Sequence, residues 1–129
     1  VELFHGYTYS AHPLAAAAAL AALDVYQKDG LFTRAKEIGQ YFEDAAHALK
    51  GAPNVVDVRN IGLMAAVELA PRPGKPTQRA YDVFTGCYER GVLTRFVGDT
   101  LTFSPPLIVQ KQHIDEMFGT LAEVLKTVG

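Results

Sequence analysis

The chain has 129 residues, of which 49% are hydrophobic and 20% are charged, and its formal net charge at pH 7 is −2. A chain of this length can bury the core of one domain. No basic stripe indicates binding to nucleic acid, and the longest apolar run, Leu14 to Leu23, is far shorter than the roughly 20 residues that cross a bilayer. We therefore expect neither a nucleic-acid nor a membrane partner. The single cysteine, Cys87, fits a reducing compartment, and we expect a cytoplasmic protein.

Residues 1–12 are predicted to form a loop, and an alanine-rich helix follows it. Pro13 suits the first turn of that helix, because the N–H that proline lacks would have no partner there in any case. The helix is predicted to continue to about Lys28 and to end at Asp29-Gly30. Since almost no polar face remains, we expect the helix to be buried against a missing domain or another subunit. The chain begins at Val1 rather than at Met, and we expect it to be a piece of a longer protein.

The remaining elements are predicted from hydrophobic periodicity and from proline and glycine positions. A helix over 31–50 comes first, followed by strands over 55–59 and 63–69 and a proline-rich exposed loop over 71–76. Pro76 opens a second helix that ends at 90–91. A hairpin of strands over 92–96 and 100–103 and a helix over about 112–128 complete the order. In the second strand the odd-numbered residues from Leu63 to Leu69 are apolar and alternate with Met64, Ala66 and Glu68. This order predicts an α+β fold, with a small, mostly antiparallel sheet and helices on one side.

Thr8 is the first residue with a candidate role. A hydroxyl group and backbone N–H groups in a glycine-containing loop, next to the start of a helix, can hold a phosphate group. The alternative is a turn threonine whose side chain satisfies the local backbone. The residues alone leave both interpretations open.

Arg95 is the second candidate. Strand alternation places it on the same face as Leu93 and Val97, and a guanidinium group can hold a carboxylate by two parallel hydrogen bonds. The alternative is an arginine that pairs with Asp99 or that is surrounded by water.

Other reactive side chains have plainer interpretations. His5, His12, His47 and His113 lack the grouping of metal ligands, and no metal is expected. Cys87, in a predicted helix, is expected to be a buried or half-buried thiol rather than a nucleophile. Asp99 is expected to fix the hairpin turn, and Tyr9 either lines a cofactor site or packs.

Three segments carry a resemblance to a known family. Residues 5–13 (HGYTYSAHP) resemble the HG-x-T-[YF]-x-x-HP motif of class III aminotransferases, which are pyridoxal 5′-phosphate (PLP) enzymes. Residues 91–101, followed by Phe103-Ser104-Pro105-Pro106-Leu107, are similar to the R-x-x-G-D-T-L…PPL segment of that family, and residues 61–69 resemble its G-L-M…E-L strand. The matches occur in family order and cover only the last third of the family. The resemblance is closest to the ω-amino acid:pyruvate (β-alanine:pyruvate) aminotransferases.

The resemblance implies roles for several residues. Residues 1–12 would form a cofactor-phosphate loop, and residues 13–129 would form the C-terminal small domain of a fold-type-I PLP enzyme, including the alanine-rich linking helix. Thr8 would bind the PLP phosphate in the neighbouring subunit, and Tyr7 would contribute its backbone N–H. Arg95 would grip the carboxylate of a keto acid or amino acid and swing aside for substrates that lack one.

The resemblance also implies what lies outside this chain. PLP chemistry needs a lysine that forms a Schiff base with the cofactor, and in the family it lies upstream of the HG-x-T motif. No lysine precedes Lys28, so no catalytic residue is assigned. The partners implied are an upstream large domain, a second subunit, and small amino and keto acids. The expected function is transamination to pyruvate or a similar keto acid. The alternatives are a catalytically silent α+β interaction module, and an aminomutase or racemase of the same fold.

Overall fold

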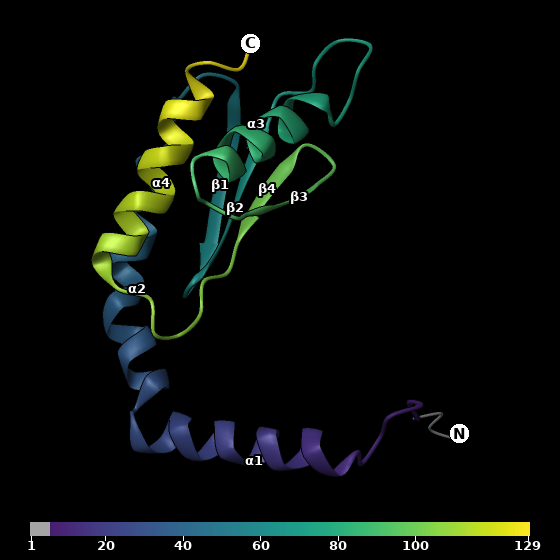
Figure 1. The fold of residues 1–129 in the computed structure, drawn as a ribbon. Coiled ribbons are helices and arrows are strands. Elements are labelled where there is room, and N and C mark those ends of the chain that lie inside the picture. Colours follow the sequence, from purple (N-terminus) through teal and green to yellow (C-terminus); the bar gives the residue numbers. More distant parts are fainter. Residues whose placement is uncertain (1–5) are drawn as a thin grey trace, which may run out of the picture. The chain divides into compact units, whose positions relative to one another are not determined.

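The computed structural model describes residues 6–129, which fall into two compact units (Figure 1). The first unit ends at Phe32, and the second comprises Thr33–Gly129. The predictions that concern residues 1–5, including His5, lie outside the described residues. The functional division predicted between residues 12 and 13 stays a prediction.

Helix α1 of the first unit, Pro13–Lys28, has the bounds that the sequence predicted. Pro13 occupies the first turn, and His12 caps the helix, with its Nδ1 accepting a hydrogen bond from the Ala15 N–H at 3.4 Å. Asp29 follows the helix, and Gly30 then adopts a φ of 59°. No residue of α1 is buried in this chain, so its predicted burial against an outside body stays a prediction.

Helix α2, Leu31–His47, ends three residues before the predicted position at Lys50. After His47 the backbone hydrogen bonds change from an i→i−4 to an i→i−3 pattern, and the Lys50 N–H donates to the His47 carbonyl at 3.1 Å. Gly51 then turns the chain with a φ of 87°, which a residue with a Cβ atom rarely adopts. The helix is therefore shorter than its apolar periodicity predicts, because its last turn tightens before the glycine.

The second unit contains one four-stranded sheet, in the order β1-β2-β4-β3, and every pair is antiparallel. The strands are β1 (Val55–Ile61), β2 (Met64–Leu69), β3 (Arg95–Val97) and β4 (Thr100–Phe103). This confirms the predicted antiparallel sheet. Strand β3 begins three residues later than predicted, and just before it the Thr94 side-chain hydroxyl, rather than a backbone N–H, donates to the Thr102 carbonyl at 2.8 Å.

Helices α3 (Gln78–Glu89) and α4 (Lys111–Leu125) complete the second unit. Helix α3 does not begin at Pro76 as predicted. The chain passes through a left-handed turn at Thr77, with a φ of 68°, and the helix starts after it. The proline-rich loop before it is mostly exposed, as predicted.

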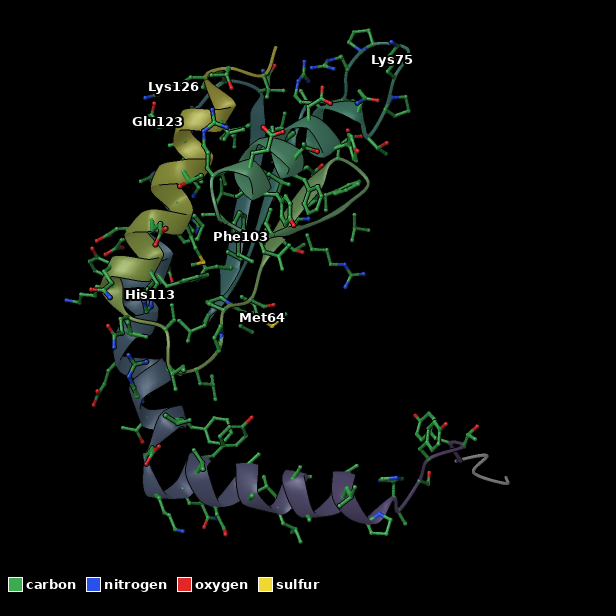
Figure 2. The ribbon with its side chains drawn as sticks, in the orientation of Figure 1. Met64, Lys75, Phe103, His113, Glu123 and Lys126 are labelled. Atoms are coloured by element: carbon green, nitrogen blue, oxygen red, sulfur yellow. The ribbon has the colours of Figure 1, made fainter. Side chains whose placement is uncertain are left out.

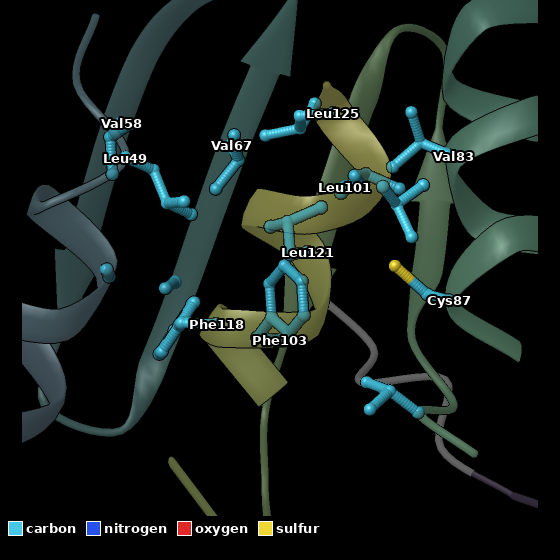
Figure 3. Close-up of a cluster of buried hydrophobic side chains, with 14 of the residues drawn as sticks. Leu49, Val58, Val67, Val83, Cys87, Leu101, Phe103, Phe118, Leu121 and Leu125 are labelled. Atoms are coloured by element: carbon cyan, nitrogen blue, oxygen red, sulfur yellow. The ribbon is translucent and has the colours of Figure 1, made fainter. Parts of the chain in front are cut away.

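The hydrophobic core lies between the sheet and the helices (Figure 3). The odd-numbered residues of β2 face it and are buried, which confirms the predicted alternation. Phe103 from β4 meets Phe118 from α4 with 5.2 Å between ring centroids, and Phe42 from α2 meets the same ring at 5.2 Å. All helices that contribute to this core therefore cover one face of the sheet, as the sequence predicted, and the other face carries exposed residues.

Candidate functional site

The open face of the sheet carries a depression with a volume of about 830 Å³. The strand register places Arg59, Ala66, Thr102 and Arg95 in one row across all four strands. Three strand spacings separate the two arginines, which corresponds to roughly 14 Å between their backbones. Apolar residues form much of the remaining wall: Ile61, Met64, Leu93, Val97, Pro105 and Pro106. In Figure 2 Met64 lies at the end of the β1–β2 hairpin, away from the helices. The depression therefore combines cationic groups with an apolar surround.

The Arg95 side chain lies on this open face, lines the depression and is exposed. Among residues 6–129, no carboxylate lies within ion-pairing distance of its guanidinium group. The alternative pairing with Asp99 is not found, because the Asp99 carboxylate accepts a hydrogen bond from the Thr77 N–H at 2.8 Å. The Asp99 carbonyl accepts another from the Leu69 N–H at 2.9 Å, so Asp99 fixes the hairpin turn as predicted. Arg95 is thus a cation that is available to an anionic ligand.

Arg59 lies in the same row but is already engaged. Its Nη1 donates to Asp57 at 2.7 Å and to Glu68 at 2.9 Å. The hydrogen bond to Asp57, and then the one to Glu68, hold the pKa of the Arg59 guanidinium above its ordinary value. The sequence analysis missed this cluster, although opposite charges two residues apart on one strand would have indicated it. The row therefore offers one available cation, Arg95.

The loop before α1 forms a hydrogen-bonded turn. The Tyr7 N–H donates to the Ser10 hydroxyl at 3.1 Å, and the Ser10 N–H donates to the Tyr7 carbonyl at 3.0 Å. Thr8 lies in this turn and is exposed. Tyr9 is 81% exposed, and its ring makes a T-shaped contact with the His12 ring at 6.2 Å between centroids. The role of Ser10 was not predicted, although a hydroxyl three residues after the N–H that it binds is typical of such turns.

This loop is compatible with a phosphate group. No acidic residue occupies the first turn of α1, and no carboxylate occurs between Gly6 and His12. A helix N-terminus carries a partial positive charge, which favours an anion. The exposed Thr8 hydroxyl supplies a donor. Tyr7 and Thr8 share this one turn of the first unit, whereas Arg95 belongs to the second unit.

The cysteine and two of the histidines contribute to packing and to hydrogen bonds within the fold. Burial raises the pKa of the Cys87 thiol to about 11, and the nearby Arg90 opposes this rise. The Nε2 atom of His47 is 2.8 Å from the Asn60 side-chain oxygen, and His113 completes a capping box at the start of α4. Among residues 6–129 we find no group of side chains that could hold a metal ion. Within the same residues, no helix has the length and apolar character needed to cross a membrane.

The fold is shared with solved transaminases. A thermostable ω-transaminase variant from Pseudomonas jessenii matches 98% of this chain with a TM-score of 0.88 and 32% identity, and the match covers 30% of that chain. The sequence matches the family described as class-III aminotransferase over residues 1–125, and the chain belongs to this family.

Two curated relatives are more similar in sequence. An ω-aminotransferase from Caulobacter vibrioides is 56% identical over 128 residues, and a β-alanine–pyruvate aminotransferase from Pseudomonas aeruginosa is 44% identical over 128 residues. Each match covers 99% of this chain and 29% of the relative. The chain therefore spans less than a third of the length of these relatives.

Proposed function

We propose that this chain is the C-terminal part of a PLP-dependent ω-transaminase, which moves an amino group from an amine or ω-amino acid to pyruvate or a similar keto acid. The observation that carries the proposal is the Arg95 guanidinium, which is exposed in a depression with mostly apolar walls and forms no ion pair with any residue in the range 6–129. The names of the relatives support it.

Arg95 would bind the carboxylate of the acid substrate. Its planar fork can donate two parallel hydrogen bonds to the two carboxylate oxygens. Because no acidic side chain within the described part of the chain holds the guanidinium group, it can also turn away when an amine without a carboxylate enters. The apolar wall near Val97 and Pro105 would then contact the substituent of the amine.

Thr8 and Tyr7 would bind the phosphate group of the PLP molecule that is held in the neighbouring subunit. The Thr8 hydroxyl would donate to a phosphate oxygen, and the Tyr7 N–H would exchange its present acceptor, the Ser10 hydroxyl, for another. When bound, the cofactor supplies the electron sink that allows the amino group to be exchanged. We place the lysine that holds the cofactor covalently in an upstream domain of the whole protein.

The proposed partners are this upstream domain and a second subunit, and the proposed location is the cytoplasm. The proposal further divides the chain into a cofactor-phosphate loop, residues 1–12, and a small domain, residues 13–129.

The proposed activity is tested first by mixing the full-length protein with β-alanine and pyruvate and measuring the alanine formed from pyruvate. Absence of alanine with this donor and with simple amines would refute the proposed activity.

The variant Thr8→Ala tests the phosphate loop. Loss of one charge-assisted hydrogen bond, which contributes on the order of 1.5–3 kcal/mol, should weaken PLP retention by roughly tenfold to a hundredfold. Thr8→Ser keeps a hydroxyl group and should retain most of the affinity. The measurement is PLP dissociation from the full-length enzyme on dilution, and equal retention in wild type and Thr8→Ala would remove Thr8 from the site.

A further inference from the structure

The segment between β4 and α4, residues 104–110, forms part of the wall of the depression. It has no regular secondary structure, and Ser104, Pro105 and Pro106 line the depression together with Arg95. Proline residues lack the N–H that would fasten such a segment to a neighbouring strand. The position of this wall therefore depends on contacts made by the rest of the segment.

Arg34 from α2 supplies two such contacts across more than 70 positions of sequence. Its Nη1 donates to the Leu107 carbonyl at 2.7 Å, and its Nη2 donates to the Val109 carbonyl at 2.5 Å. Among residues 6–129, no carboxylate lies within ion-pairing distance of Arg34, so its guanidinium group is directed at the backbone alone. The side chain is half-buried, which shields these charged hydrogen bonds from competing water.

The segment held by Arg34 is itself closed by local contacts. The Val109 N–H donates to the Pro106 carbonyl at 2.9 Å, and the Val109 side chain is buried in the core. A displacement of Leu107 and Val109 would therefore carry Pro106 with it. The planar guanidinium fork can hold two carbonyl groups at once, which the ammonium group of a lysine does less well.

We propose that Arg34 is a positioning residue for the substrate depression. Its guanidinium group fixes residues 107–109 and so keeps Pro105 and Pro106 in place as the wall that an amine substituent contacts. The identity of the ligand rests on the proposed function, whereas the hydrogen bonds of Arg34 to residues 107–109 are independent of it.

The test uses full-length wild type, Arg34→Gln, Arg34→Lys and a matched control, Arg90→Gln. Arg90 is exposed and also donates to a backbone carbonyl, that of Gly86 at 2.8 Å, but at the C-terminal end of α3. Amide hydrogen exchange over residues 104–110 should accelerate on the order of tenfold in Arg34→Gln, because hydrogen bonds from a charged donor are lost. Arg34→Lys should give an intermediate rate and Arg90→Gln the wild-type rate.

Kinetics of the same variants test the link to the substrate. With an amine that has a bulky apolar substituent, Arg34→Gln should raise KM about fivefold and change kcat less than about twofold, because the wall acts on binding. Unchanged exchange in Arg34→Gln, or faster exchange with an unchanged KM, would overturn the proposal. If the wild type transfers no amino group, the proposed function fails, and the exchange measurement still decides whether Arg34 holds the segment.

Discussion

At the scale of single residues, two arginines on one sheet face differ in their surroundings. Arg59 is clamped between Asp57 and Glu68, whereas Arg95 has no acidic neighbour within ion-pairing distance among residues 6–129. A guanidinium group beside two carboxylates gains little from a third, because the neighbouring carboxylates already compensate its charge and repel a further anion. The chemical capacity of the open face is therefore set by the absence of a carboxylate beside Arg95, as much as by the arginine itself.

The thiol of Cys87 gives a prediction about pH. The unfolded thiol has a pKa near 9, and burial raises the folded value to about 11. Between these values the unfolded state has lost the proton and the folded state keeps it, so stability falls as pH rises from about 9 to about 11. The full loss, reached above pH 11, is roughly 2–3 kcal/mol, of which about 1.5–2 kcal/mol falls between pH 8.5 and 10.5, and Cys87→Ala should lack this component. Urea unfolding of both chains at pH 8.5 and 10.5 measures it, and parallel losses in the two chains would contradict this account.

At the scale of elements, the sequence predicted those features that periodicity controls. The alternation of β2 and the apolar stripe of α4 were predicted because each repeats over several residues. The first residues of α3 and β3 were not, because they follow single contacts at Thr77 and Thr94 rather than a repeating pattern. The resemblance indicated Arg95, but neither its freedom from Asp99 nor the contact of Arg34 with residues 107–109 could be predicted. The first depends on the contact of Asp99 with Thr77 and the second on the contact of α2 with the segment before α4, and each contact joins residues far apart in sequence.

The approach of α3 to α4 gives a prediction at this scale. A Cβ atom at Gly86 would lie 2.8 Å from Cγ1 of Val124, a stiff and buried side chain. Gly86→Ala should therefore destabilise the fold by about 1–2 kcal/mol, since overpacking outweighs the gain in helix propensity.

The control for this variant is Gly119→Ala in α4, where a Cβ atom would meet nothing within 4 Å. That substitution should stabilise the helix by up to about 1 kcal/mol. Urea unfolding followed by circular dichroism measures both changes. A Gly86→Ala chain as stable as Gly119→Ala would show that the two helices separate at no cost.

At the scale of the whole molecule, the exposed helix α1 calls for an explanation. None of its residues is buried, and Leu14, Leu20 and Leu23 are 78%, 66% and 55% exposed. Soluble monomers rarely expose apolar surface of this extent on one element. The relatives are more than three times as long as the chain, so the surface that covers α1 is proposed to lie in the upstream domain or in a second subunit.

This exposure predicts association of the 129-residue chain, or its co-assembly with an upstream fragment. Sedimentation velocity should give a mass above the 14.0 kDa of the single chain. Leu20→Glu should shift the equilibrium toward the monomer, because a charge then faces the apolar contact. A wild-type chain that sediments as a monomer would contradict the predicted burial of α1.

The most direct test of the central claim compares Arg95→Ala with Arg59→Ala in the full-length enzyme. Loss of a desolvated two-pronged carboxylate contact costs about 2–4 kcal/mol, so Arg95→Ala should raise the KM for pyruvate roughly thirtyfold or more. Arg59→Ala, whose side chain is already paired, should change it less than about twofold. The half-reaction with an amine that lacks a carboxylate, followed as pyridoxamine formation in a single turnover, should be nearly unchanged in both variants. If Arg95→Ala slows both half-reactions equally, Arg95 holds structure and the assignment as a carboxylate clamp is wrong.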